Sequence, residues 1–156
     1  MQEHGLKISE LVTLFNLEVL NRGSDYDTAL LTITDVNRPG LQFHSFYDYF
    51  DPRRLQVLGK AEITYLKGLT SEQRRKCFDD LFLYDIPALV ISRGLDCFPE
   101  CLESARVHER TLLRTEETTV EFTSHTIEYL NRVLAPCVTR HGVLLDISGE
   151  GVMITG

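Results

Sequence analysis

The stretch IPALVIS, residues 86–92, is the clearest strand in the sequence. It is a continuous apolar run that ends at Ser92, without the alternation that a half-exposed strand shows. Strands of this kind are typical of parallel sheets, in which helices cover both faces. The stretch therefore predicts a buried strand with helices on either side of its sheet.

The segments around this strand alternate between strand and helix patterns. We expect further strands beside Leu17 and Val19 and at residues 27–36, 53–59 and 110–115. We expect helices beginning after Ser9 and at Pro99, and helices at residues 60–68, 71–82 and 123–136. The alternation predicts an α/β fold, with a mixed, largely parallel sheet flanked by helices in three layers.

Local signals mark where several of these helices begin. Ser9 is expected to be an N-cap, and Thr70 with Gln73 matches a capping box. Pro99 suits the first position of a helix, where its missing N–H costs nothing. The basic run at residues 74–76 is expected to be a solvated helix face rather than an anion site.

The stretch FHSFYDYF, residues 43–50, is the strongest local bias in the chain. Its aromatic residues Phe43, Phe46, Tyr47 and Phe50 have the spacing of one helical face. Such a stripe can grip a ring-shaped ligand, but core or subunit interface is the favoured reading. We therefore expect an aromatic helix that is packed against something.

Composition and charge narrow the class of protein. The chain has 156 residues, is 43% hydrophobic and 25% charged, and carries a formal net charge of −7. An acidic chain is poorly suited to a nucleic-acid backbone or an anionic membrane surface, so we expect neither partner. The N-terminus has no signal-peptide pattern, and we expect a cytoplasmic protein.

The four cysteines do not form a metal-binding pattern. They are Cys77, Cys97, Cys101 and Cys137. The close pair at 97 and 101 has no second Cys/His pair at zinc-finger spacing, so we expect reduced thiols and no metal.

The pattern changes after Pro136. Residues 143–147 alternate like a strand, residues 149–151 form a glycine turn, and residues 152–155 return. We expect residues 1–135 to be one α/β domain, and residues 136–156 to be a linker and a C-terminal β-hairpin of a truncated second domain. A strand that ends in Gly156 is also how a phosphate-binding loop begins, but one glycine does not establish such a loop.

Two segments carry a family resemblance. RHGVLLDISGEGVMITG, residues 140–156, resembles the entry to the catalytic domain of bacterial HPr kinase/phosphorylase, which leads into a Walker A loop. NRPGLQFHSFYDYFDPRRLQVLGKAEITYL, residues 37–66, is similar to that family's N-terminal domain. YDIPALVISRGL and the helix before Pro136 fit the same pattern, so the resemblance extends over essentially the whole chain.

The resemblance implies a bifunctional regulatory enzyme. Such proteins phosphorylate a serine of the phosphocarrier HPr with ATP or pyrophosphate and Mg²⁺. They also remove this phosphate by phosphorolysis, and both reactions serve carbon catabolite control. The family typically forms homohexamers.

His141 and Gly156 are the two site residues that the resemblance places in this chain. It makes His141 the active-site histidine, able to hydrogen-bond phosphate or share protons near neutral pH. It makes Gly156 the first Walker A glycine, where the missing Cβ allows close approach to phosphate. The Walker A Lys, the catalytic Asp and the Mg²⁺ ligands are expected beyond residue 156, so we expect these 156 residues alone to be inactive and to bind no cofactor. Without the resemblance, His141 would be read as a surface or packing residue.

Two alternatives to the kinase fragment remain from the sequence. One is a structural or oligomerisation module that uses the aromatic stripe for packing. The other is a small-ligand-binding module, since the family's N-terminal domain resembles the uridine-nucleotide-binding domain of muramyl ligases; this is an analogy of fold alone.

Overall fold

The computed structural model describes residues 5–135. At its centre is a five-stranded sheet in the order β2-β7-β6-β5-β4, with β4 to β7 parallel and β2 antiparallel to β7. The strands are β2 (Glu18–Asn21), β4 (Val36–Asn37), β5 (Leu55–Leu58), β6 (Leu89–Ile91) and β7 (Leu112–Arg114). The predicted buried strand is β6, which lies at the middle of the sheet between β5 and β7. The prediction of a mixed, largely parallel sheet is confirmed.

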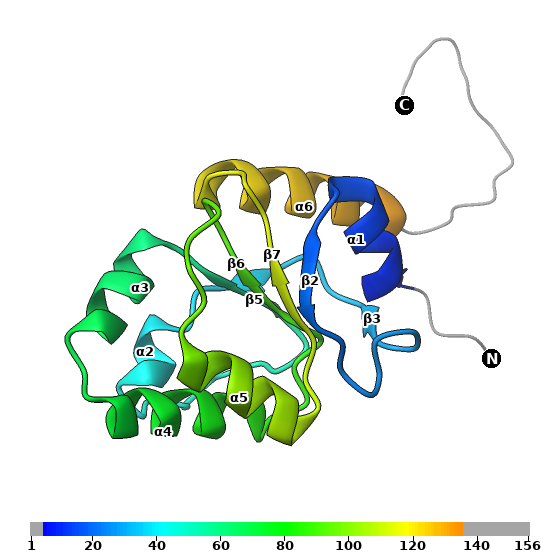
Figure 1. The fold of residues 1–156 in the computed structure, drawn as a ribbon. Coiled ribbons are helices and arrows are strands. Elements are labelled where there is room, and N and C mark those ends of the chain that lie inside the picture. Colours follow the sequence, from blue (N-terminus) through cyan, green and yellow to red (C-terminus); the bar gives the residue numbers. More distant parts are fainter. Residues whose placement is uncertain (1–4, 136–156) are drawn as a thin grey trace, which may run out of the picture.

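Helices cover both faces of this sheet, as Figure 1 shows. On one face lie α1 (Ile8–Phe15) and α6 (Thr119–Val133), packed on a cluster that includes Val57, Val90 and Leu113. The other face packs on a second cluster that includes Leu58, Leu89 and Leu112. Its helices are α2 (Gly40–Phe43), α3 (Lys60–Lys67), α4 (Ser71–Phe82) and α5 (Pro99–His108). Neighbouring residues of each strand thus point to opposite faces, and the predicted three layers are present.

The predicted strand at residues 27–36 is largely wrong. It contains β3 (Leu30–Leu31), which pairs antiparallel with β1 (Leu6–Lys7) in a separate two-stranded sheet. The β-branched residues 32–34 are not in a strand, and the chain then enters β4 of the main sheet. Residues 27–36 therefore serve two sheets, because the chain bends between them.

The helix starts follow the capping signals only in part. The Thr70–Gln73 box is confirmed, with Gln73 N donating to Thr70 Oγ1 at 3.1 Å and Thr70 N donating to Gln73 Oε1 at 3.0 Å. Pro99 is confirmed as the first residue of α5. The N-cap at Ser9 is wrong, because α1 already begins at Ile8. The last helix begins at Thr119, four residues earlier than expected, since Thr118 and Glu121 form another capping box.

The aromatic stretch at residues 43–50 is not a helix. The short α2 ends at Phe43, and Ser45 and Tyr49 then adopt left-handed backbone, with φ of 67° and 64°. Left-handed conformations interrupt a right-handed helix. Phe43 packs in the core, whereas Tyr47 and Phe50 pack on Tyr84 from the loop after α4.

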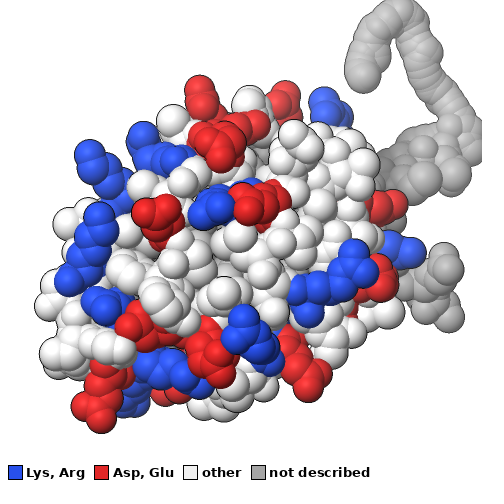
Figure 2. Space-filling view, in the orientation of Figure 1, with Lys and Arg blue, Asp and Glu red and all other residues white. Residues whose placement is uncertain are grey.

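The basic run at residues 74–76 is only partly a solvated face. Lys76 is exposed, but the Arg74 side chain is 18% exposed and is held at the meeting point of three helices. Its guanidinium donates to the carbonyl oxygens of Leu66 and Leu69 and forms an ion pair with Glu100 at 3.2 Å. On the face shown in Figure 2, acidic and basic side chains are interspersed.

The two ends of the described region lie close together. Gly5 and Leu6, before α1, line the same hollow as Tyr129 and Val133, near the end of α6. Within residues 5–135, no helix is long and apolar enough to cross a membrane. The expected linker and hairpin at residues 136–156 lie outside the described residues.

Candidate functional site

The carboxyl edge of the parallel strands brings the sequence motifs together. Ligands of open α/β sheets are usually bound at this edge, where the loops after the strands meet. Here these loops begin at Arg38 after β4, Gly59 after β5, Ser92 after β6 and Thr115 after β7. The candidate site therefore lies at this edge of the sheet.

Arg38 and Glu62 join two parts of the stretch at residues 37–66, which carries the family resemblance. Glu62 Oε1 accepts hydrogen bonds from Arg38 Nη2 at 2.9 Å and from the Gly59 backbone N–H at 2.7 Å. The first turn of a helix attracts anions because its N–H groups lack partners within the helix. In α3 an internal carboxylate, only 9% exposed, already fills this position.

Gly59 allows the side chains of Arg38 and Thr119 to approach the backbone closely at the same edge. A Cβ at this position would lie 2.5 Å from Thr119 Oγ1 and 2.6 Å from Arg38 Nη2. Ser92 Oγ donates to the Leu58 carbonyl at 2.9 Å and lies 2.6 Å from Thr119 Oγ1. The loops after β4, β5, β6 and β7 are thus held in direct contact.

An amide network connects this edge to the aromatic segment. Asn37 Nδ2 donates to Gln56 Oε1 at 2.7 Å and to Gln42 Oε1 at 3.0 Å. Gln42 Nε2 in turn donates to the Phe46 carbonyl at 3.2 Å. Gln56 is fully buried, so these bonds satisfy amide groups that have no access to water.

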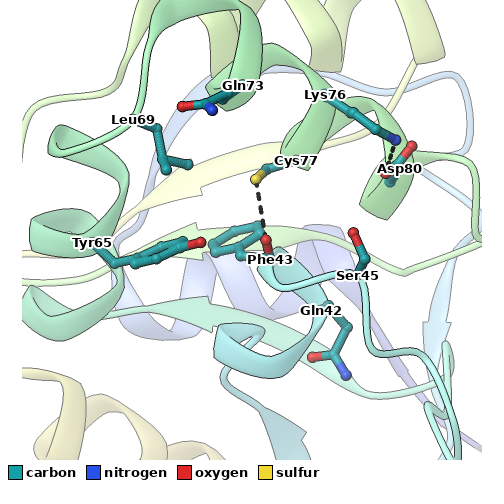
Figure 3. A pocket seen from close by; sticks show the side chains of 9 residues that line it. All are labelled: Gln42, Phe43, Ser45, Tyr65, Leu69, Gln73, Lys76, Cys77 and Asp80. Carbon is teal, nitrogen blue, oxygen red and sulfur yellow. Dashed lines mark hydrogen bonds and ion pairs between the residues drawn. The ribbon is translucent and has the colours of Figure 1, made fainter.

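A small hollow lies on the other side of the aromatic segment, between α2, α3 and α4 (Figure 3). Its volume is about 180 Å³, below the range of roughly 300–1,000 Å³ that is typical of ligand pockets. Lys76 and Asp80 form an ion pair of 2.9 Å at its rim, and the Cys77 thiol donates to the Phe43 carbonyl at 3.4 Å (Figure 3). The hollow has room for a side chain or a small molecule, but not for a nucleotide.

The titratable groups of the described domain serve mainly to hold its helices. Hydrogen bonds from Arg74 and Ser71 lower the pKa of Glu100 to about 2, and burial raises the pKa of the Tyr47 hydroxyl and of the Cys77 thiol. Within residues 5–135, no three His, Cys, Asp or Glu side chains are gathered where they could hold a metal ion. The carboxyl edge is therefore a hydrogen-bonded junction of loops.

The predicted site residues His141 and Gly156 lie outside the described residues, so their positions stay predictions. The structure instead brings together Arg38, Glu62, Gly59 and Thr119, which sequence reasoning did not select. The motif letters of the segments at residues 37–40 and 59–62 were visible in the sequence. Their contact was not, because it depends on which strands are neighbours.

Residues 6–130 match the family model described as "HPr Serine kinase N terminus". The chain belongs to the HPr serine kinase family. Named relatives include the HPr kinase/phosphorylases of Alkaliphilus metalliredigens, 42% identical over 151 residues, and of Clostridium perfringens strain SM101, 41% identical over 152 residues.

The matched part is about half of each relative. The alignments cover 97% of this chain but only 48% and 49% of those two proteins. The match to an N-terminal family model agrees with the α/β domain of residues 5–135 as the N-terminal domain of HPr serine kinases.

One solved structure shares the fold. It is the CBS and DRTGG domain region of Clostridium perfringens pyrophosphatase, described in complex with the activator diadenosine tetraphosphate. The TM-score is 0.54 at 14% identity, over 85% of this chain and 51% of that one. This likeness concerns the fold alone.

Proposed function

We propose that the chain is the N-terminal part of an enzyme that phosphorylates a serine of HPr with ATP or pyrophosphate, and that removes this phosphate by phosphorolysis. The supporting observation is the identity of 41–42% over 97% of the chain to proteins named HPr kinase/phosphorylase. We assign the activity to a protein of the relatives' length, because the chain spans only about half of it. HPr is the proposed partner, with a role in carbon catabolite control in the cytoplasm and a homohexameric assembly.

In this proposal the 156 residues alone are inactive. Phosphoryl transfer depends on positioning and on neutralisation of phosphate charge by Lys and Mg²⁺. At the carboxyl edge of the described domain, Arg38 lies at the start of α3 and is already paired with Glu62. ATP, pyrophosphate and Mg²⁺ are therefore assigned to the enzyme as a whole, and its N-terminal domain is given a supporting role.

The test of inactivity is direct. The 156-residue chain is incubated with HPr, Mg²⁺ and either ATP or pyrophosphate, and the intact mass of HPr is measured. The Clostridium perfringens relative serves as the positive control. We expect unmodified HPr with the short chain, and a phosphorylated HPr would contradict the proposal.

We further propose that His141 acts beside the transferred phosphate and that Gly156 opens the nucleotide loop. In a protein of the relatives' length, His141→Ala should lower both the kinase and the phosphorylase rates by about a hundredfold or more. His125→Ala is the matched control, since this exposed imidazole on α6 bonds Glu117 at 3.1 Å, within the N-terminal domain. Equal rates for His141→Ala and the control would remove His141 from the mechanism.

A second candidate function is a packing module, and exposed apolar side chains around the aromatic segment favour it. Leu41, Phe46, Tyr49 and Leu83 are 62%, 44%, 98% and 68% exposed. Aromatic groups such as Phe46 and Tyr49 are enriched in the cores of protein interfaces. Light scattering of the 156-residue chain and of Tyr49→Ser tests this role: association that the substitution abolishes supports it, and a monomer at all concentrations removes it.

A further inference from the structure

A second hollow lies between α3 and the loop that joins β6 to α5, and its volume is about 330 Å³. The β6–α5 loop leaves the carboxyl edge of the parallel strands, where open α/β sheets usually bind their ligands. The volume falls at the lower end of the range of roughly 300–1,000 Å³ that is typical of ligand pockets. The hollow therefore has room for one small molecule.

Most of the residues around this hollow are apolar. Ile63 on α3 is 4% exposed, and Leu95, Phe98 and Pro99 line the opposite side, from the loop and the first position of α5. Apolar surfaces that meet release water, which favours their contact. The lining therefore suits a ligand that carries an aliphatic group.

Two arginines hold the loop side of the hollow in place. The Arg114 guanidinium, at the end of β7, donates to the Leu95 carbonyl at 3.2 Å. The Arg74 guanidinium lies over the Phe98 ring, 4.9 Å from its centroid. The Leu95 backbone N–H also donates to the Ser92 carbonyl at 3.2 Å. A pocket whose walls are fixed before binding loses less conformational freedom when a ligand enters.

Two opposite charges line the hollow without neutralising each other. The Lys67 ammonium and the Asp96 carboxylate both belong to exposed lining residues. Neither group has a hydrogen bond or an ion pair with another group of residues 5–135. Lys76 and Asp80, at the hollow of Figure 3, differ, because they pair with each other at 2.9 Å. Lys67 and Asp96 are therefore each able to take an opposite charge from a ligand.

We propose that this hollow binds a free amino acid with an aliphatic side chain, such as leucine. The ligand carboxylate pairs with Lys67, its ammonium pairs with Asp96, and its side chain contacts Ile63 and Phe98. A carboxylic acid or an amine alone would leave one of the two protein charges without a partner, whereas a zwitterion supplies both. The terminal residue of a peptide carries only one of these charges, so we assign the hollow to the free amino acid.

L-leucine is the probe that tests this site. It is titrated at neutral pH into the ¹⁵N-labelled 156-residue chain, and the amide signals are followed by NMR. A ligand of this size at exposed charges should have a dissociation constant of about 1 mM, so its concentration is raised to about 20 mM. We expect saturable shifts at residues 63–67 and 95–98 and none on α1. L-serine, which lacks the aliphatic group, should give no saturable shift.

Analogues and variants test each charge separately. L-leucinamide lacks the carboxylate and mimics the first residue of a peptide, and N-acetyl-L-leucine lacks the ammonium and mimics the last one. Each should bind about three- to fivefold more weakly than L-leucine, because an exposed charged pair adds little. Lys67→Met should weaken L-leucine by the same factor and leave L-leucinamide unchanged. Asp96→Asn should likewise weaken L-leucine but not N-acetyl-L-leucine. Lys60→Met, at an exposed lysine that begins α3, is the matched control and should bind as wild type.

Two outcomes would overturn the proposal. One is the absence of saturable shifts when L-leucine is added to the wild-type chain. The other is L-leucinamide or N-acetyl-L-leucine binding as tightly as L-leucine, since the hollow would then not recognise a zwitterion. Circular dichroism establishes that each variant is folded, and the wild-type titrations decide by themselves if one is not. Binding is expected in the 156-residue chain itself, so a negative result would leave the proposed phosphorylation of HPr untouched.

Discussion

Both faces of the sheet bury aromatic rings, and the α4–α5 face adds polar bridges between its helices. On the α1–α6 face, rings meet edge to face, with the Phe15 ring 5.9 Å from that of Phe122 and 6.4 Å from that of Tyr129. On the α4–α5 face, polar bridges connect the helices above the apolar layer. Arg74 pairs with Glu100, and Asp79 accepts hydrogen bonds from Ser104 and His108.

This difference affects how the stability of each face depends on contact geometry and on pH. Apolar burial is strong but non-directional, whereas charged hydrogen bonds also fix position and depend on pH. The polar bridges of the α4–α5 face are therefore expected to depend on pH.

The largest effect should come from the apolar face. Phe122 is fully buried between α6 and the sheet, and Phe122→Ala should lower the free energy of unfolding by about 3–5 kcal/mol. Urea denaturation measures this. The control Val120→Ala, at a position on α6 that is 70% exposed, should change it by less than about 0.5 kcal/mol. Similar losses for both variants would show that α6 does not pack as described.

The next effect concerns the polar bridge of the other face. Arg74→Ala removes the ion pair with Glu100 and the donors to two carbonyls at the end of α3, and should cost about 1–3 kcal/mol in the same measurement. Lys76→Ala, two residues along α4, breaks an exposed ion pair with Asp80 and should lower the stability far less than Arg74→Ala does. If the two variants are equally stable, the bridge adds nothing beyond a surface contact.

Acid should weaken the α4–α5 face through Glu100. Its pKa falls from an ordinary value of 4.5 to about 2 in the folded chain, so the unfolded chain binds more protons between these values. The contribution of Glu100 is present above pH 4.5 and is lost as the pH falls toward 2. Asp51, bound by Arg53, also titrates at about 2, so the comparison is between wild type and Glu100→Gln. Wild type should be the more stable at pH 7, and the gap should close toward pH 2; a constant gap would contradict the assignment.

The smallest expected effect is an increase in stability. Thr126 on α6 is fully buried, and its hydroxyl has no hydrogen-bond partner among the residues that the structure describes. Thr126→Val should stabilise the chain by up to about 1 kcal/mol, because a buried unpaired hydroxyl is costly. Thr119→Val is the matched control, since that hydroxyl lies 2.6 Å from Ser92 Oγ, and it should destabilise the chain. Thermal melting of both variants checks the opposite signs.

Sequence patterns predicted the layers but not the local exceptions. The apolar run of residues 86–92 predicted β6 correctly, because a short continuous apolar run has few interpretations other than a strand that is buried on both faces. The aromatic run of residues 43–50 has helical spacing, yet it is irregular: Tyr47 and Phe50 find a partner in Tyr84, distant in sequence, and left-handed residues break the helix. Spacing describes a helix that could form, and tertiary packing decides whether it does.

The contacts of the candidate site were even less predictable from the sequence. Arg38 and Glu62 both lie in the stretch at residues 37–66 that resembles the family, but only the pairing of β4 with β5 in the sheet places their side chains 2.9 Å apart. The burial of Arg74, which lies within a basic run, likewise could not be predicted from the sequence, because its partners come from α3 and α5.

The closeness of Gly5 to the end of α6 has a topological consequence. Since both ends of the domain line one hollow, a short peptide can join them without crossing the sheet. The domain is thus suited to circular permutation, with new termini opened at the exposed Leu83 beyond α4. Its fold would then be specified by the order of strands in space, independently of where the polypeptide begins.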